Sequence, residues 1–220
     1  MVLFDIDGTL VDCGGAGRQS MEVAFARLHG ARDVFVDLRF GGMTDRAIAR
    51  HGLGVTGHEA TESAIDAVLA VYLAHLRETL PGSLGFRVLA GGARAANRAR
   101  EAGAAVGIGS GNIRGGAQLK LSCAGLEHLF DFGGYGCDSE ARDQVLRMGR
   151  DRGAAKLGWD PNACEVVIVG DTPRDVLAAK AIGARCLGVT TGRFDAAALV
   201  GADLVASSLE DEEALRFLER

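Results

Sequence analysis

The chain has 220 residues, of which 48% are hydrophobic, and it carries a net charge of −5. This length fits one domain, or a domain with a small insertion, around a sizeable core. Basic residues form no run, so we expect no nucleic acid partner, because binding to a phosphate backbone needs clustered Lys and Arg. We also expect no membrane partner, because no apolar stretch approaches the ~20 residues of a membrane span.

The cysteines point to a reducing compartment. The five are scattered, their number is odd, and none forms a C-x-x-C pair, which disfavours a disulfide framework. No signal-peptide pattern leads into the first strand. We therefore expect reduced thiols and a cytoplasmic location. The sequence does not indicate an oligomeric state.

The N-terminal part of the chain is predicted to be one strand followed by helices. An apolar strand over 2–6 ends before the glycine-rich segment 14–17, and helical periodicity then extends over about seventy residues. Thr56 and Glu59 have the spacing of a capping box and predict the start of a second long helix there. Leu80-Pro81-Gly82 is predicted to end that helix.

After residue 83, short apolar runs alternate with helical stretches. Strand–helix alternation indicates an α/β fold, with a Rossmann-like parallel sheet and helices on both of its faces. The first strand belongs to this sheet, so residues 1–14 and 84–220 are predicted to form the core domain and residues 15–83 an inserted helical cap, placed to act as a lid. Strands are predicted over 105–109, 130–135, 166–169 and 186–190, and helices over 92–102, 114–124, 140–157 and 173–183.

Three predicted strands end in polar residues. Asp5 and Asp7 end the first strand, Ser110-Gly111-Asn112 follows the strand over 105–109, and Asp171 to Asp175 follows the strand over 166–169. In open α/β sheets, ligands bind at the carboxyl ends of strands. If these strands are neighbours, their polar ends converge into one site.

The residue types in this predicted site favour phosphate chemistry with Mg²⁺. Several carboxylates without His or Cys suit Mg²⁺ rather than zinc. Ser110, flanked by glycine at a strand-to-helix turn, offers a hydroxyl and nearby backbone N–H groups to phosphate oxygens. One carboxylate can attack phosphorus, and a second can protonate the leaving oxygen and then activate water.

The motifs resemble those of the haloacid dehalogenase-like superfamily. Residues 4–10 (Phe-Asp-Ile-Asp-Gly-Thr-Leu) match its first motif, D-x-D-G-T-L, and Ser110 stands where its second motif places Ser or Thr. Residues 170–175 resemble its fourth motif, G-D-x-x-x-D. The resemblance covers essentially the whole chain, including the helical insertion, which looks like the small helical cap of the family.

The resemblance implies roles for the acidic residues. Asp5 would be the nucleophile and a Mg²⁺ ligand. Asp7 would be the general acid and base and would bind the metal through its backbone carbonyl. Asp171 would be a further metal ligand, and Asp175 is a candidate ligand beside it. Dehalogenases of the superfamily lack the second aspartate of the first motif, so Asp7 argues against dehalogenation.

Two local segments indicate the class of substrate. Residues 41–45 and 109–112 are similar to those of phosphoglycolate phosphatase-like members. The function we expect is Mg²⁺-dependent hydrolysis of a small phosphorylated metabolite, such as a phosphoglycolate-like ester, through an aspartyl phosphate. Two alternatives stay open: a phosphomutase of the beta-phosphoglucomutase type and a non-catalytic phosphate-binding module.

The third motif of the superfamily is where this sequence departs from the pattern. That motif supplies a Lys or Arg, often as Lys-Pro, and no Lys-Pro occurs here. Arg142 stands near the expected position, three residues after Ser139, which is predicted to cap the helix. Lys120, in the helix after Ser110, is the alternative. We favour Arg142.

Several further candidates have a structural interpretation beside the functional one. Gly111 and Asn112 are expected to contact substrate because they adjoin Ser110. Thr44 could reach the substrate from the cap or simply begin a helix. Arg18 is a substrate-binding candidate at the entrance of the cap or an ordinary solvated helix residue. Asp175 could bind metal or act as the partner of Thr172 in a helix cap.

Overall fold

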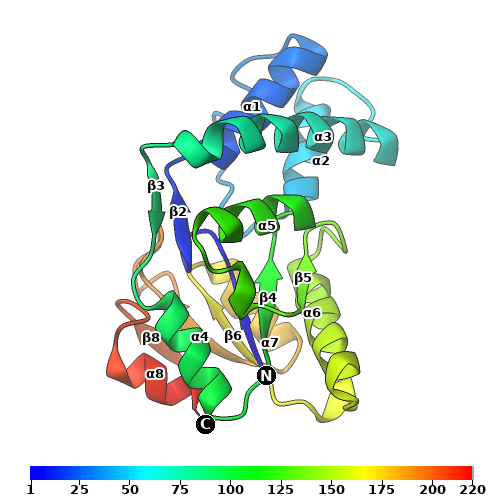
Figure 1. Ribbon diagram of the computed structural model, residues 1–220. Coiled ribbons are helices and arrows are strands. Elements are labelled where there is room, and N and C mark those ends of the chain that lie inside the picture. Colours follow the sequence, from blue (N-terminus) through cyan, green and yellow to red (C-terminus); the bar gives the residue numbers. More distant parts are fainter. Residues whose placement is uncertain (220) are drawn as a thin grey trace.

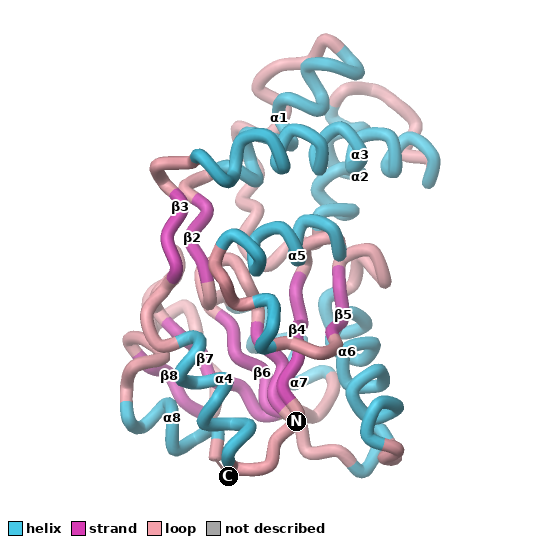
Figure 2. The backbone as a smooth tube through the Cα atoms, in the orientation of Figure 1, coloured by secondary structure: helices cyan, strands magenta, loops and turns pink. Residues whose placement is uncertain are grey.

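The centre of the molecule is a six-stranded sheet, seen in the computed structural model, which describes residues 1–219 (Figure 1, Figure 2). Every neighbouring pair of strands is parallel. The strand β1 lies in the middle, between β4 and β6. This confirms the predicted α/β class. The order is β5 (Gly133–Tyr135), β4 (Val106–Ser110), β1 (Val2–Phe4), β6 (Val167–Gly170), β7 (Arg185–Val189) and β8 (Leu204–Ala206).

Helices cover both faces of this sheet, which explains why its strands read as continuous apolar runs. Successive strand residues point to opposite faces: Val2 and Phe4 belong to one hydrophobic cluster and Leu3 to another. The cluster of Phe4 includes residues of α4 (Gly92–Glu101), α5 (Arg114–Cys123) and α8 (Glu212–Leu218). The cluster of Leu3 includes residues of α6 (Arg142–Leu157) and α7 (Pro173–Ala181).

Residues 16–82 form a helical unit that lies above the sheet in Figure 1. Two antiparallel strands, β2 (Val11–Cys13) and β3 (Phe86–Val88), connect it to the rest of the chain. The predicted boundaries at 14/15 and 83/84 fall just beyond these strands, and the division into core and cap domains stays a prediction. The helical unit contains α1 (Ala16–His29), α2 (Asp45–Val55), α3 (Glu62–Thr79) and the 3₁₀ helix η1 (Leu80–Gly82).

The helices of residues 1–219 include none with both the length and the apolar composition that crossing a membrane requires. Two further 3₁₀ turns, η2 (Glu127–Leu129) and η3 (Pro161–Ala163), complete the elements.

Two predicted helix starts are wrong. The helix α3 begins at Glu62 with Thr61 as its N-cap, whereas the Thr56 hydroxyl donates to the Gly52 carbonyl, 2.9 Å away, at the end of α2. Gly57 follows with φ of +73°, a left-handed conformation that terminates a helix. Ser139 does not cap α6 either, because that helix begins at Arg142 and the Ser139 hydroxyl accepts from the Ala141 N–H, 3.1 Å away.

Candidate active site

The three polar strand ends lie next to one another, as the sequence analysis predicted. Phe4 pairs with Ile108 of β4 on one side and with Val169 of β6 on the other. The strands are parallel, so their carboxyl ends meet at one edge of the sheet. Asp5, Ser110 and Asp171 therefore emerge side by side from β1, β4 and β6.

Asp5 is buried at the end of the central strand. Its N–H donates to the Val169 carbonyl, 2.8 Å away, which fixes the backbone, and the Arg142 guanidinium lies 3.0 Å from its Oδ1. Burial raises the pKa of Asp5 to about 6 even though Arg142 works in the opposite direction. The surroundings of Asp5 therefore contain too little positive charge to offset the burial of its carboxylate.

Arg142 is shared between two carboxylates. Its Nε and Nη2 donate to Asp175 Oδ1 at 3.0 and 2.6 Å, while Asp175 Oδ2 accepts from the N–H and the hydroxyl of Thr172 at 3.1 and 2.7 Å. Thr172 and Asp175 form a capping box at the start of α7. Both oxygens of Asp175 thus have partners, which supports a role in holding Arg142 and α7 rather than direct metal ligation.

Asp171 is the member of the cluster with a free oxygen. It is buried, and its Oδ1 has no hydrogen-bond partner among residues 1–219. Burial, followed by the charges of Asp5 and Asp175, raises the pKa of Asp171 to about 9. Oxygen atoms of Asp5, Asp171 and Asp175 lie within 4.8 Å of one another. An orphaned carboxylate oxygen among crowded carboxylates is a donor set that fits a hard divalent cation.

Two glycines let the backbone approach Asp171. A Cβ built on Gly8, which has φ of +82°, would lie 2.2 Å from Asp171 Oδ2, and one on Gly192 would lie 1.8 Å from the same atom. The Thr191 hydroxyl donates to the Gly8 carbonyl, 2.6 Å away, and ties the two loops together. Thr191 and Gly192 were not among the predicted site residues. Their position directly after the predicted strand over 186–190 was the signal that could have identified them as a fourth strand end.

Asp7 has a different set of partners. Lys120 Nζ lies 2.9 and 2.6 Å from its two carboxylate oxygens, and Asn112 Nδ2 donates to Oδ2 at 2.7 Å. The Cys13 thiol also contacts this carboxylate. Burial works to raise the pKa of Asp7, but Lys120 and Asn112 outweigh it and hold that pKa below its ordinary value. The side chain of Asp7 is 43% exposed, so it keeps access to solvent.

Ser110 and its neighbours form the predicted turn after β4. Ser110 is fully buried, and its hydroxyl accepts from Asn112 Nδ2 at 2.8 Å. The Gly111 carbonyl accepts from the Asp45 N–H at 2.8 Å, and a Cβ at Gly111 would lie 2.2 Å from the Met43 carbonyl oxygen. Gly111 therefore provides the close contact between this turn and the helical unit.

The helical unit supplies a helix cap to the sheet domain. Asp45 Oδ2 accepts from the Ile113 N–H at 2.8 Å, at the start of α5, where Ile113 itself provides no capping side chain. The Tyr72 hydroxyl donates to Asp45, and burial raises the pKa of Asp45 to about 6. Thr44 caps α2 by accepting from Ala47 N, and its hydroxyl contacts the Glu140 carbonyl at 3.3 Å.

Arg18 lies against its own helical unit. Its guanidinium donates to the Phe35 carbonyl at 2.9 Å and to the Leu38 carbonyl, and it stacks on the Phe40 ring with 4.3 Å to the centroid. These contacts organise the loop after α1. The prediction that Arg18 binds substrate has no contact here that supports it.

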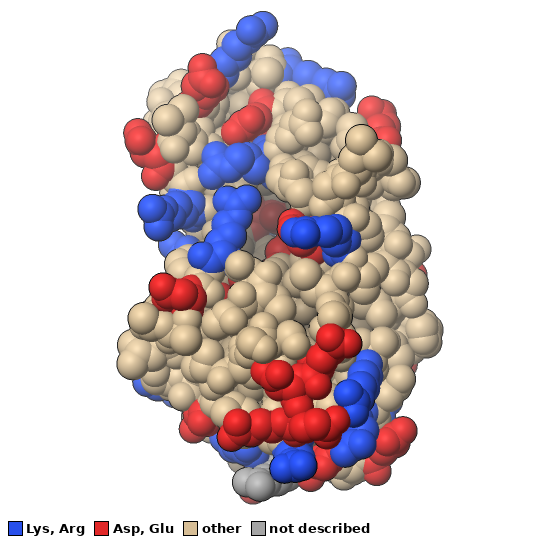
Figure 3. All heavy atoms as spheres, turned by 90° about the vertical axis from the view of Figure 1, so that its left-hand side faces the viewer, with Lys and Arg blue, Asp and Glu red and all other residues tan. Residues whose placement is uncertain are grey.

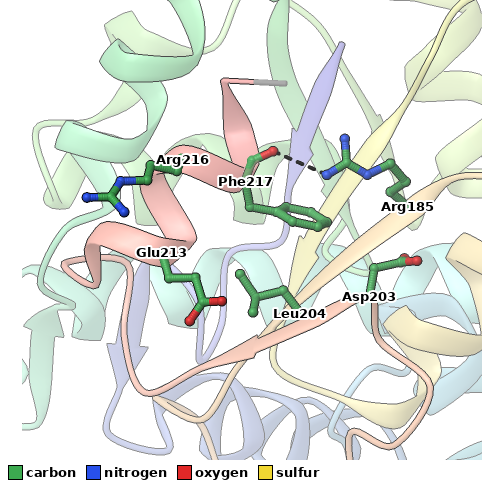
Figure 4. A pocket seen from close by; sticks show the side chains of 6 residues that line it. All are labelled: Arg185, Asp203, Leu204, Glu213, Arg216 and Phe217. Atoms are coloured by element: carbon green, nitrogen blue, oxygen red, sulfur yellow. Dashed lines mark hydrogen bonds between the residues drawn. The ribbon is translucent and has the colours of Figure 1, made fainter.

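The concave regions of the molecule include a hollow and a separate cavity. A hollow between the helical unit and the sheet shows acidic atoms in its depth and Lys and Arg side chains around its mouth (Figure 3). A separate cavity lies near the starts of β7 and β8, lined by Arg185, Asp203, Leu204, Glu213, Arg216 and Phe217 (Figure 4). The second cavity is at the amino ends of the strands, away from the acidic cluster.

Comparison with known proteins relates this geometry to a family. The model of the haloacid dehalogenase-like hydrolases matches residues 1–183. Validoxylamine A 7'-phosphate phosphatase from Streptomyces hygroscopicus subsp. limoneus is 27% identical over 212 residues, which cover 96% of this chain and 94% of the relative.

Solved structures share the fold. A predicted phosphoglycolate phosphatase from Haemophilus somnus has a TM-score of 0.70 and 19% identity, with 98% of this chain and 97% of that one covered. Beta-phosphoglucomutase from Clostridium difficile has a TM-score of 0.73 and 15% identity, with 99% and 96% covered. The overall fold is thus shared with both a predicted phosphatase and a beta-phosphoglucomutase.

Proposed function

Because this chain belongs to the haloacid dehalogenase-like hydrolases, we propose that it is a Mg²⁺-dependent phosphatase that hydrolyses a small phosphate ester through an aspartyl phosphate. One observation carries the proposal. Asp5, Asp7, Asp171, Ser110 and Arg142 meet at the carboxyl ends of three adjacent strands, with one buried carboxylate oxygen of Asp171 left without a partner among the described residues.

In the first step, a carboxylate oxygen of Asp5 attacks phosphorus. The bond from phosphorus to the ester oxygen breaks. Asp7, which is ionised in the free protein, takes up a proton from the monoanionic phosphate ester and passes it to the leaving oxygen. In the second step, water attacks phosphorus while the Asp7 carboxylate takes its proton. The bond from phosphorus to Asp5 breaks, and inorganic phosphate and the free Asp5 carboxylate are released.

Positive charge comes from two sources in this proposal. Asp5 and Asp171, with the backbone carbonyl of Asp7, would hold Mg²⁺, which when bound neutralises charge on the carboxylates and the phosphoryl group. Arg142 faces Asp5 and would contact the phosphoryl oxygens, assisted by the Ser110 hydroxyl and the N–H groups of the turn at Gly111 and Asn112. Arg142 is our choice for the cation of the third motif.

The hollow of Figure 3 is where we place the entrance for the substrate. The helical unit would then be the predicted cap domain, residues 15–83, and would cover the site during the reaction. The curated relative is named for a validoxylamine phosphate ester, and a solved neighbour for phosphoglycolate. We propose a substrate of this general class, a small phosphorylated metabolite, and a cytoplasmic protein.

The test is a panel of phosphate esters assayed with a titration of Mg²⁺. The panel includes phosphoglycolate, validoxylamine A 7'-phosphate and hexose phosphates, and both inorganic phosphate release and isomerisation are measured. We expect phosphate release that requires Mg²⁺, and acid quenching should trap a phosphorylated Asp5. Isomerisation without phosphate release would identify a phosphomutase instead, and no turnover of any ester would favour the non-catalytic phosphate-binding module.

A further inference from the structure

Lys120 has no donor left for a substrate. It lies on α5 with a side chain that is 4% exposed, and its Nζ contacts both oxygens of Asp7 and, at 2.5 Å, Asn112 Oδ1. An ammonium group has three protons, and three acceptors surround it here. All three N–H groups of the Lys120 ammonium are therefore used in hydrogen bonds within the protein.

Asn112 completes the support of Asp7. Its amide oxygen accepts from Lys120, and its Nδ2 donates to Asp7 Oδ2 and to Ser110 Oγ. Lys120 thus fixes which way this amide faces, and the amide in turn fixes the carboxylate. Asp7 is held by two side chains that are more than 100 residues distant in sequence.

The helical unit encloses Lys120 from the other side. A Cβ built on Gly17 would lie 3.9 Å from Lys120 Nζ and 4.0 Å from the Tyr72 hydroxyl. Burial works to lower the pKa of Lys120, but the carboxylate of Asp7 outweighs it and raises that pKa well above its ordinary value. Lys120 is therefore a permanent, closely packed cation with one orientation.

We propose that Lys120 is a positioning residue: it holds the carboxylate of Asp7 in the orientation needed for hydrolysis of the phosphoenzyme and does not touch the phosphoryl group. This inference rests on the proposed phosphatase function. It divides the two basic side chains of the site between two tasks, because Arg142 contacts Asp5 and Lys120 contacts Asp7.

The experiment uses the full chain with p-nitrophenyl phosphate and Mg²⁺. The nitrophenolate leaving group needs no proton, so kcat/KM reports phosphoenzyme formation, and slow hydrolysis lowers kcat and KM together. For Lys120→Met we expect kcat to fall by about 10- to 100-fold, part of the roughly 10²- to 10⁴-fold typical of general acid–base catalysis. We expect kcat/KM to stay within about 3-fold, with a burst of one nitrophenolate per site. The control is Lys156→Met, at an exposed lysine that pairs with Asp131.

A double-mutant comparison covers the case in which Lys120→Met does not fold. Asp7→Asn with Lys120→Met has no unpaired charge, and its rate of phosphoenzyme formation should equal that of Asp7→Asn alone, because a residue that acts through Asp7 has no further effect once Asp7 is removed.

Three results would overturn the proposal: wild-type kinetics in Lys120→Met, a loss confined to kcat/KM, or an additional loss in the double variant. Either of the last two results would mean that Lys120 contacts the phosphoryl group. Absence of a phosphoenzyme in the wild type would instead reject the proposed function, so the two failures are distinguishable.

Discussion

The two carboxylates of the first loop stand two residues apart and have opposite surroundings. The Asp5 half of the site consists of Asp5, Asp171 and Asp175 around one guanidinium, that of Arg142, and all four side chains are buried. The Asp7 half consists of Asp7, Lys120 and Asn112, where one carboxylate meets one ammonium and an amide.

The difference shows how one loop can supply two chemical roles. The Asp5 half has an excess of buried negative charge, which favours binding of a cation and of a group that the cation neutralises. The Asp7 half is balanced without any ligand and keeps its carboxylate partly exposed to water. A nucleophile suits the first environment, and a base for water suits the second.

Removing the nucleophile should have the largest effect. Asp5→Asn keeps the size of the side chain, so the fold should persist, while turnover and aspartyl-phosphate formation should be lost by a factor of about 10⁴ or more. Phosphate release and acid-quenched phosphoprotein measure the two losses. The exposed Asp37→Asn serves as the control, and near-normal activity of Asp5→Asn would contradict the assignment of the Asp5 half.

Removing the cation of each half should affect stability unequally. Arg142→Met leaves Asp5 and Asp175 buried without their partner, which typically costs about 3–5 kcal/mol. Lys120→Met leaves without a donor Asp7, which solvent reaches, and the uncharged amide oxygen of Asn112. Its loss of unfolding free energy should therefore be smaller by at least about 1 kcal/mol. Urea unfolding of both metal-free variants measures this difference. Equal losses would mean that the two halves are not electrostatically distinct.

The excess charge of the Asp5 half should also make stability depend on pH. Folded Asp171 keeps its proton to about pH 9, whereas the unfolded chain releases it near 3.8. The folded form therefore binds more protons between these values, and the metal-free protein should lose stability as pH rises through them.

Asp171→Asn tests this dependence. At pH 8 the metal-free variant should be more stable than the wild type by about 2 kcal/mol, because Asn is neutral without taking up a proton on folding, whereas Asp171 must take one up to be buried uncharged. Its melting temperature should also vary less with pH. Mg²⁺ at about 100 times its Kd should stabilise the wild type by about 2.7 kcal/mol and the variant far less. A wild type whose stability rises from pH 5 to pH 8 without metal would contradict the interpretation.

The convergence of the polar strand ends was predictable from the sequence, but the contacts of Lys120 with Asp7 were not. Asp5, Ser110 and Asp171 each follow an apolar run, so the rule for parallel strands brings them together once β1, β4 and β6 are neighbours. Lys120 contacts Asp7 because of the rotation of α5 about its axis, which depends on packing against the helical unit. The spacing of apolar residues does not determine that rotation. The sequence therefore offered Lys120 only as the alternative cation of the third motif.

Contacts between residues that are far apart in the sequence could not be predicted either. Tyr72 lies among the buried residues of α3, and its position in an apolar stripe indicates only a core residue, but its hydroxyl reaches Asp45. The strands β2, β3 and β8 were missed because each has only three residues and, unlike the equally short β1, none of them is buried along its whole length. The missed Thr191 and Gly192 required knowing that β7 lies beside β6.

The smallest predicted effect concerns Asp45, which links the helical unit to the Asp7 half. Asp45→Ala removes the acceptor for the Ile113 N–H and should cost about 1 kcal/mol, as the loss of a helix cap usually does. Asp45→Asn keeps an acceptor of the same shape but carries no charge. The pKa of Asp45 is raised from 3.8 to about 6 in the folded protein. The folded form therefore binds more protons between these values, and the wild type should lose stability as pH rises through them.

The two variants together separate the cap from the charge. The gain in stability of Asp45→Asn over the wild type should be larger at pH 8 than at pH 5, while Asp45→Ala should be less stable than Asp45→Asn at both values. Urea unfolding at pH 5 and pH 8 measures these differences. Equal free energies of unfolding for Asp45→Ala and Asp45→Asn would show that α5 needs no cap from the helical unit. The orientation of Lys120 would then depend on the sheet domain alone.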